Sequence, residues 1–157
     1  MKDNREVTSL GTWTIQFREE EPAPIREKGD VLPRVAELIR GHSTGRITVD
    51  EDVGGRSWIE RVLLGLHPRF LQGHFSLEWS GEVAALIFFD EAESEHRAID
   101  REHPIAADET IRRALANGEF TPIPVEQCMS LRRAHQAIEE YLKTGVRPGW
   151  LEYEYVQ

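Results

Sequence analysis

A Gly-x-Ser-x-Gly string is the chain's most direct hint of covalent chemistry. It runs Gly41-His42-Ser43-Thr44-Gly45, and in a nucleophile elbow such a string exposes a serine on a sharp turn between a strand and the helix that follows. Here the surrounding pattern predicts the reverse order, with a helix that ends at Gly41 and a strand that begins near Arg46. We therefore interpret the glycines as a helix stop and a loop residue, and keep a small serine hydrolase using Ser43 as an alternative.

A second candidate for nucleophilic chemistry pairs a thiol with an imidazole. Cys128 and His135 lie seven residues apart in a segment that we predict to be one helix, so their α-carbons are separated by about 10 Å along its axis. This separation exceeds the hydrogen-bond distance that a nucleophile and its base require. We interpret Cys128 as an ordinary buried cysteine.

Metal-capable side chains occur in two groups. Neither group has the His-x-x-x-His spacing that places two imidazoles on one face of a helix. The groups are His96, Asp100, Glu102 and His103, and the pair His67 and His74. The sequence therefore predicts no metal, no cofactor and no catalytic residue, and we expect a protein that is not an enzyme.

The charge balance narrows the class of partner. The chain has 19 basic and 28 acidic residues, a formal net charge of −9, which disfavours binding to the phosphate backbone of nucleic acid. Acidic clusters are either solvated loops or a face complementary to a basic protein, and steering by such a face raises association rates by about 10 to 10³ at low salt. As a binding surface we predict first Asp90, Glu91, Glu93 and Glu95, and second Asp50, Glu51 and Asp52.

The apolar pattern predicts the elements that position these residues. The expected strands are 12–18, 46–50, 75–80, 83–89, 96–99 and 151–155, the expected helices are 30–40, 57–66, 108–115 and about 125–144, and 19–29 is expected to be a loop. Residues 83–89 are nearly all apolar, so we expect a central strand covered on both faces. Strands grouped in the middle of the chain, with helices before and after them, predict an α+β fold with a mainly antiparallel sheet.

Length and composition bound the class of molecule. At 157 residues the chain suits a single domain, residues 1–157, that buries roughly 70% of its unfolded surface. Its one cysteine excludes an internal disulfide, and its first residues lack an apolar signal segment. The longest apolar run is far shorter than the ~20 residues that span a bilayer. We therefore expect a soluble, cytoplasmic protein with no membrane contact.

The C-terminal segment, residues 123–155, has the most specific pattern. Pro124 suits the first turn of a helix, where its missing amide would have no partner, and Gly145 suits the left-handed residue that ends one. Glu139 and Lys143 are spaced to pair on the surface of that helix. One buried stripe is predicted by the three- and four-residue spacing of Cys128, Leu131, Ala134, Ile138, Tyr141 and Leu142.

This ending resembles the Imm-one type of immunity proteins of bacterial polymorphic toxin systems. That family commonly closes with an Ile/Val-Pro step, a helix rich in Ala and Glu, a Tyr-Leu-x-Thr-Gly helix end, Arg-Pro and a last strand with an aromatic residue. The corresponding residues are Ile123-Pro124, Tyr141-Leu142-Lys143-Thr144-Gly145, Arg147-Pro148 and the run from Trp150 to Tyr155, about a fifth of the chain. The family's final tryptophan tends to stand where this chain has Tyr153.

The resemblance implies an inhibitor with no turnover of its own. Such a protein binds a cognate toxin domain and occludes its active site, and the toxin is expected to be basic and to belong to the deaminase superfamily or otherwise to attack nucleic acid. A generic interaction module without a toxin partner stays the other alternative.

Overall fold

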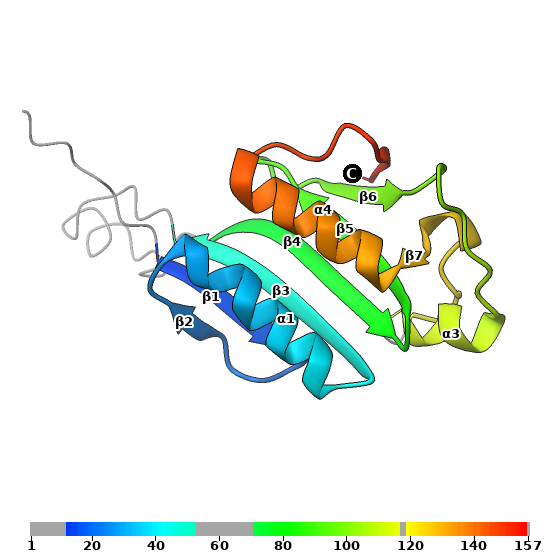
Figure 1. Cartoon of the computed structure of the whole chain (residues 1–157), viewed down its shortest axis with the longest axis horizontal. Helices are drawn as coiled ribbons and strands as arrows, with labels where there is room; N and C mark the ends of the chain where they lie inside the picture. Colours follow the sequence, from blue (N-terminus) through cyan, green and yellow to red (C-terminus); the bar gives the residue numbers. More distant parts are fainter. Residues whose placement is uncertain (1–11, 53–70, 117–118, 157) are drawn as a thin grey trace, which may run out of the picture.

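The computed structural model describes residues 12–52, 71–116 and 119–156. Within them an open antiparallel sheet forms the centre, and three helices pack against it (Figure 1). The predicted α+β fold with a mainly antiparallel sheet is confirmed. The helix predicted at 57–66 lies outside the described residues.

Most of the observed helices and strands occur where the sequence pattern predicts them. The elements, in chain order, are β1 (Thr12–Phe17), β2 (Ala23–Ile25), the 3₁₀ turn η1 (Lys28–Asp30), α1 (Val31–Gly41), β3 (Thr44–Asp52), β4 (Leu71–Ser80), β5 (Val83–Phe89), β6 (Glu95–Ile99), α3 (Glu109–Ala114), η2 (Val125–Gln127), β7 (Met129–Ser130), α4 (Leu131–Thr144) and β8 (Glu152–Val156).

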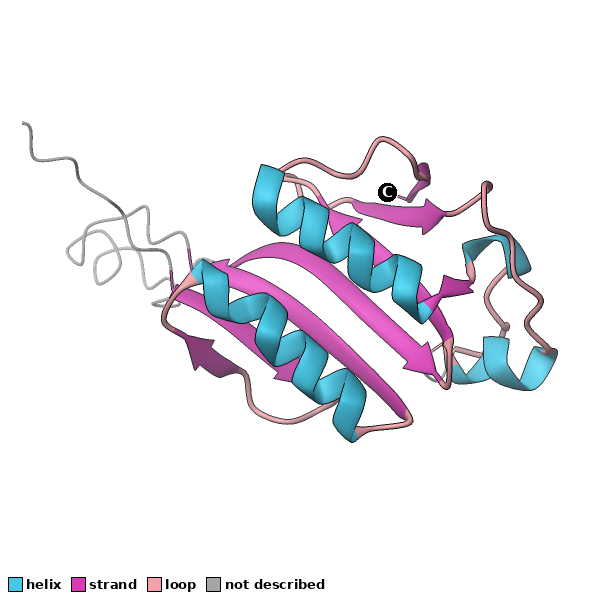
Figure 2. Cartoon of the chain, viewed as in Figure 1, coloured by secondary structure: helices cyan, strands magenta, loops and turns pink. Residues whose placement is uncertain are grey.

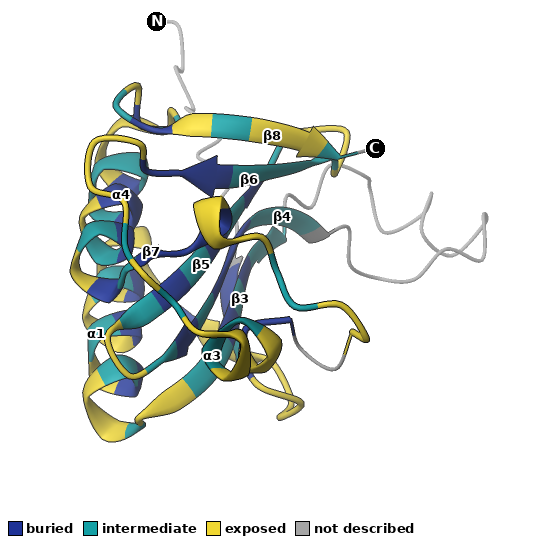
Figure 3. Ribbon diagram, turned by 90° about the vertical axis from the view of Figure 1, so that its right-hand side faces the viewer, coloured by how far each residue is buried: buried dark blue, intermediate teal, exposed yellow. Residues whose placement is uncertain are grey.

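The strands are ordered β2-β1-β3-β4-β5-β6-β8, and β7 pairs with β5 outside this path. All these pairs are antiparallel. The helices α1 and α4 lie side by side across one face of the sheet, as Figure 2 shows, whereas α3 lies on the other side (Figure 3). The last strand, β8, forms one edge of the sheet, and its Glu152 and Glu154 are exposed.

The core lies between the sheet and the pair α1 and α4. The predicted alternation is confirmed, because Phe75, Leu77 and Trp79 of β4 and every second residue of β5 are buried under these helices. The sheet contributes Trp13, Ile15, Phe17, Ile47, Val49, Phe75, Leu77, Trp79, Ala84, Leu86 and Phe88, and the helices contribute Val31, Val35, Leu38, Leu131, Ala134, Ala137, Ile138 and Leu142.

The second face of β5 is only half covered, contrary to the prediction that both faces are buried. Ala84, Leu86 and Phe88 are inaccessible, but the alternate residues Val83 to Phe89 are intermediate in exposure. The segment that contains α3 covers this face in part (Figure 3). The second face of β5, which carries Val83, Ala85, Ile87 and Phe89, is therefore apolar and partly open to solvent.

The C-terminal helix begins later than predicted, which is a correction of its start near Val125. Residues 125–127 form the single turn η2, Cys128 is extended, and α4 starts only after Ser130. Two interactions fix this start: β7 pairs with β5, and the Ser130 hydroxyl accepts the Arg133 backbone N–H over 3.2 Å. Cys128 therefore lies outside the helical stripe.

The end of the helix and its buried stripe are confirmed, whereas Tyr155 of the last strand is exposed. The remaining members of the stripe face the core or pack against it, and Lys143 lies 3.0 Å from the Glu139 carboxylate. Gly145 ends the helix with a φ of 71°, a left-handed conformation that glycine adopts without the steric cost of a side chain. The helix end that the sequence pattern identifies is therefore the real one.

Two N-terminal predictions differ from the structure. The expected loop 19–29 contains β2 and η1, and Pro24 is tolerated in β2 because that strand is at the edge of the sheet and needs no second set of hydrogen bonds. The strand expected at 46–50 is longer, running from Thr44 to Asp52. The acidic residues 50–52 therefore belong to a strand and not to a loop.

Candidate functional site

Both acidic candidates lie at the same end of the sheet. Residues 50–52 close β3 and pair with the first residues of β4, while residues 90–93 form the turn that leaves β5. The Gln72 side chain of β4 bridges them, because its amide donates to the Asp90 carbonyl oxygen over 2.8 Å. The structure thus brings together two clusters that are 40 positions apart in the sequence, from 50 to 90.

The two clusters also interact through their charges. Burial raises the pKa of Asp50, and the nearby carboxylate of Glu93 raises it further. Because side chains alternate along a strand, Asp50 and Glu51 point to opposite faces of the sheet, and the acidic end presents carboxylates on both.

Glu95 does not belong with the others. It lies in β6 and pairs with Arg97, whose guanidinium Nη2 is 3.2 Å from the Glu95 carboxylate. Both residues line a different cavity, on the sheet face that α3 covers. The first candidate cluster is therefore divided by the fold into residues 90–93 and the separate Glu95.

Asp90 has a structural task within its own turn. One carboxylate oxygen accepts the backbone N–H groups of Ala92 and Ser94, each over 2.9 Å, and the other lies 2.9 Å from Nε2 of His96. The hydrogen bond from His96, followed by those from Ser94 and Ala92, lowers the pKa of Asp90. Its oxygens are thus largely engaged, and the exposed Glu91 and Glu93 are the freer members of the cluster.

A β-bulge shapes the acidic end. Val49 pairs with Phe75 but Asp50 pairs with Gly73, so His74 is an extra residue in β4 without a partner in β3. The bulge turns His74 onto the helix side, where its ring stacks on Trp13 at a centroid distance of 4.3 Å. In a regular strand, the His74 side chain would lie on the opposite face of the sheet from Phe75.

His74 is the centre of a carboxylate–imidazole–phenol chain. Its Nε2 lies 2.9 Å from the Glu51 carboxylate and its Nδ1 lies 2.7 Å from the Tyr141 hydroxyl of α4. Because a carboxylate only accepts, Nε2 carries the proton, and Nδ1 accepts the tyrosine O–H. The free lone pairs of the Tyr141 oxygen then remain available as acceptors.

Burial favours the neutral form of the His74 imidazole. It lowers the pKa of His74 despite the opposing effect of Glu51, and the charge of Lys28 lowers it further. Burial also raises the pKa of Tyr141, with a contribution from Glu51. Sequence reasoning treated His74 only as a metal-capable residue and missed this arrangement, because the expected strand began at Phe75 and left His74 outside the sheet.

A hollow of about 660 Å³ lies between the hydrogen-bonded side chains of Glu51, His74 and Tyr141 and the acidic turn after β5. Carboxylates outnumber the single guanidinium among its lining residues, and aromatic rings supply its apolar wall. It is lined by Glu51, Gln72, Gly73, His74, Phe89, Asp90, Glu91, Tyr141, Gly145, Val146 and Arg147. The hollow therefore suits a group that donates hydrogen bonds and carries positive charge.

The Gly-x-Ser-x-Gly string has the order helix, turn, strand that was predicted, since α1 ends at Gly41 and β3 begins at Thr44. Ser43 is exposed, and its hydroxyl has no hydrogen bond to another described residue. The neighbouring His42 points away, with Nδ1 3.0 Å from the Leu38 carbonyl oxygen. Among the described residues, Ser43 therefore has no neighbouring base of the kind that a serine nucleophile requires.

The other chemistry-bearing residues are engaged in packing. Burial raises the pKa of the Cys128 thiol, and its sulfur lies 3.8 Å from the Pro124 carbonyl oxygen. The buried Asp100 carboxylate binds Arg133 at 2.7 Å and 3.2 Å. Within the described ranges no group of three His, Cys, Asp or Glu side chains could hold a metal ion.

Comparisons with protein-family models, with curated proteins and with solved structures gave no match. The fold and the acidic end define the class as an α+β protein with an open antiparallel sheet and a charged, hollowed end. None of the helices in the described segments is long and apolar enough to cross a membrane.

Proposed function

We propose that this chain is an immunity protein that binds a basic bacterial toxin domain and blocks its active site. The observation that carries the proposal is the meeting of the two acidic clusters at one end of the sheet, where Glu51, Asp90 and Glu91 line one hollow. The resemblance of residues 123–155 to the Imm-one type of immunity proteins supports the same class. The proposed toxin belongs to the deaminase superfamily or otherwise attacks nucleic acid, and the proposed site of action is the cytoplasm.

The proposed mechanism is occlusion. A toxin that acts on nucleic acid needs a basic groove to hold phosphate, and an acidic end that fills this groove excludes the substrate. Glu91 and Glu93 are exposed at the tip of the turn, so they would meet basic side chains first. A standard interface of ~1,600 Å² is large enough to cover such a groove. The inhibitor needs no catalytic residue for this task.

A charge-reversal experiment tests the proposal. The C-terminal toxin domain encoded by the adjacent reading frame is co-expressed with the chain, and binding is measured over a range of salt concentrations. The double variant Glu91→Lys and Glu93→Lys should bind with an association rate at least about tenfold lower at low salt. Its rate should also depend less steeply on salt than that of the unaltered protein.

The matched control is Glu20→Lys with Glu21→Lys. These residues are also exposed, but they follow Phe17, which pairs with Ile47 at the far end of β3 from Asp52. The same change in net charge there should leave the association rate within a factor of about two or three, since only local charges are complementary. Equal loss in both double variants, or failure of the unaltered chain to protect cells from the toxin, would contradict the proposal.

A further inference from the structure

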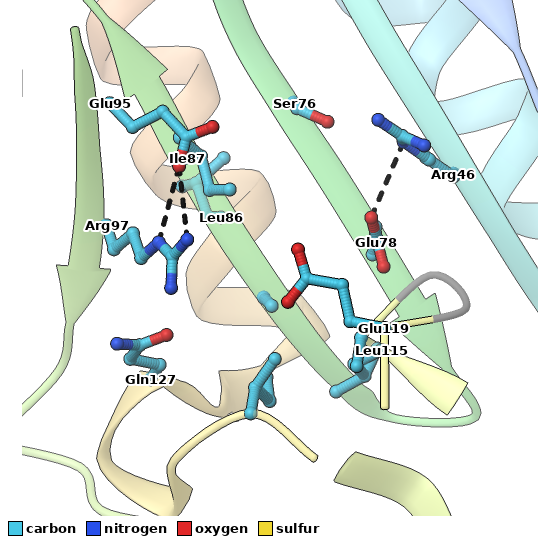
Figure 4. A pocket seen from close by; sticks show the side chains of 13 residues that line it. Arg46, Ser76, Glu78, Leu86, Ile87, Glu95, Arg97, Leu115, Glu119 and Gln127 are labelled. Carbon is cyan, nitrogen blue, oxygen red and sulfur yellow. Dashed lines mark hydrogen bonds and ion pairs between the residues drawn. The ribbon is translucent and has the colours of Figure 1, made fainter. Parts of the chain in front are cut away.

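A second cavity, of about 140 Å³, lies on the sheet face opposite α1 and α4. Its floor is made by β3 to β6, and its other wall by the segment after α3 (Figure 4). Charged residues of both signs converge in it beside an apolar wall. The charged residues are Arg46, Glu78, Glu95, Arg97 and Glu119, and the apolar wall is Ala85, Ile87, Leu115 and Ile123.

The charges in this cavity are not balanced. Arg97 is paired with Glu95, and Nε of Arg46 lies 3.4 Å from the Glu78 carboxylate. Glu119 remains, and its carboxylate points into the cavity between these two pairs (Figure 4). In the part of the chain that the structure describes, that carboxylate has no hydrogen bond or ion pair. The exposed Glu119 therefore adds one unpaired negative charge at the open side of the cavity.

Glu78 shows the same excess of negative charge. Its side chain is only 17% exposed, and burial raises its pKa to about 7, with Arg46 opposing the shift and Glu119 adding to it. The distance of 3.4 Å from Arg46 is too long for a good charge-assisted hydrogen bond, and the buried Arg46 Nε has no hydrogen-bond partner among the described residues. Arg46 therefore compensates Glu78 incompletely, and near neutral pH about half of the molecules carry a proton there.

We infer that this cavity binds a small organic cation, a protonated amine or guanidine on a short apolar chain. Its N–H groups would donate to the carboxylates of Glu78 and Glu119, and its carbon chain would lie against Ile87 and Ile123. No residue of the acidic end takes part, so this site is independent of the proposed function. The same cationic group can be supplied by a free metabolite or by a lysine or arginine side chain of another protein.

Binding at this site is linked to a proton. The cation takes the place that the proton occupies on Glu78, so it binds the ionised form and releases the proton. With a pKa of about 7, Glu78 is roughly nine-tenths protonated at pH 6 and nine-tenths ionised at pH 8. The affinity for the cation is therefore expected to rise about tenfold between these two pH values.

The test titrates n-butylammonium into the isotopically labelled full chain at pH 6 and pH 8, at constant ionic strength, and follows backbone amide resonances. We expect saturable shifts at Ala85, Ile87 and Ile123, with a dissociation constant about tenfold lower at pH 8. The neutral isostere 1-butanol and the anion butyrate are titrated in parallel. Equal binding of 1-butanol, stronger binding of butyrate, or no saturable shift would overturn the inference.

Isosteric variants assign the site to its carboxylates. Glu78→Gln should weaken binding at pH 8 at least about tenfold and abolish the pH dependence, and Glu119→Gln should weaken it at both pH values. The exposed Glu21→Gln is the control and should change neither. Retention of the full pH dependence in Glu78→Gln would refute the role of Glu78.

A further ligand distinguishes the source of the cation. Nα-acetyl-lysine methylamide carries the same ammonium group on a peptide-like body. If it binds as tightly as n-butylammonium, the cavity is open to a lysine of another protein, and if only n-butylammonium binds, the cavity takes free amines. Both outcomes support the cation site.

Discussion

Nδ1 of His74 lies 2.7 Å from the hydroxyl of Tyr141, and this contact joins the bulge in β4 to the last turns of α4. The two residues are 67 positions apart in the sequence. The same imidazole is fixed by Glu51 on the sheet and by stacking on Trp13. The helix end and the acidic end of the sheet are therefore held in one arrangement by a single ring.

Removing the tyrosine hydroxyl tests this connection. Tyr141→Phe leaves the His74 Nδ1 lone pair half-buried and without its donor, so the free energy of unfolding should fall by about 1–2 kcal/mol in urea denaturation. Tyr155→Phe is the control, because its hydroxyl makes an exposed contact with Ser94, and it should change stability by no more than about 0.5 kcal/mol. Equal losses of stability in the two variants would argue against a stabilising role for the hydrogen bond between Tyr141 and His74.

The low pKa of His74 predicts acid sensitivity. The folded protein binds this proton less readily than the unfolded chain, whose histidine titrates near 6.5. The contribution of His74 to stability is therefore complete above pH 6.5 and is lost as the pH falls through the folded value. The difference in unfolding free energy between the unaltered protein and His74→Asn, measured from pH 8 to pH 5, should shrink toward acid pH. A difference that stays constant with pH would contradict this assignment.

Glu78 should act in the opposite direction. Its folded pKa of about 7 lies above the ordinary 4.5, so its contribution is complete below pH 4.5 and is lost as the pH rises through 7. In the window between these values this one group makes stability fall with pH by at most about 1.4 kcal/mol per pH unit. In this pH window, the free energy of unfolding of Glu78→Gln, measured by chemical denaturation, should fall less steeply with pH or should rise. An unchanged profile in the variant would show that Glu78 titrates normally.

The pair of Asp100 and Arg133 should be a major stabilising contact. The Asp100 side chain is inaccessible, and Arg133 binds it through two nitrogens while its guanidinium lies 4.0 Å from the centre of the Trp150 ring. Asp100→Asn should cost about 3 kcal/mol in the free energy of unfolding, because it removes the buried counter-charge of a largely buried guanidinium and leaves only the exposed Glu102 carboxylate, 3.7 Å away. Glu152→Gln, which breaks the exposed pair with Arg101, should cost less than about 1 kcal/mol. Thermal and urea unfolding measure both variants. Similar losses of stability in Asp100→Asn and Glu152→Gln would contradict this ranking.

Gly45 is required by packing rather than by chemistry. A Cβ atom there would lie 2.3 Å from the Trp79 ring and 2.9 Å from the Phe17 ring. Gly45→Ala should therefore destabilise by about 1–3 kcal/mol through overpacking. A Cβ at Gly41 meets nothing within 4 Å, so Gly41→Ala should be neutral or stabilising by up to about 1 kcal/mol. Unfolding of the two variants in urea checks the contrast, which fails if Gly45→Ala is harmless.

Much of the fold could be predicted from local pattern. The alternation of Phe75, Leu77 and Trp79, with turn chemistry at Ser80-Gly81, identified the central hairpin. Gly145 identified the end of α4 because only the local conformation matters there. The start of that helix was misplaced because pairing of Met129 with Ala84 depends on a strand 45 positions away, which no local pattern contains.

The candidate site was predictable only in its composition. The sequence identified the acidic clusters, but their meeting depends on the register of β3, β4 and β5. Register also removed Glu95 from the set and placed it with Arg97. His74 was missed because the expected strand began at Phe75, whereas β4 begins at Leu71 and carries a bulge that turns His74 toward the helices. Long-range pairing, and not residue type, decided each of these outcomes.

The edge strand β8 has a consequence for self-association. In the described part of the chain no strand pairs with its outer side, and an open edge of this kind is a template on which further chains can stack. The exposed Glu152 and Glu154 would face the same residues of any second molecule that docked there in the same way. Although Arg101 pairs with Glu152 and Gln127 donates to Glu154, like charges along this rim would repel those of a second molecule and so disfavour lateral growth of the sheet.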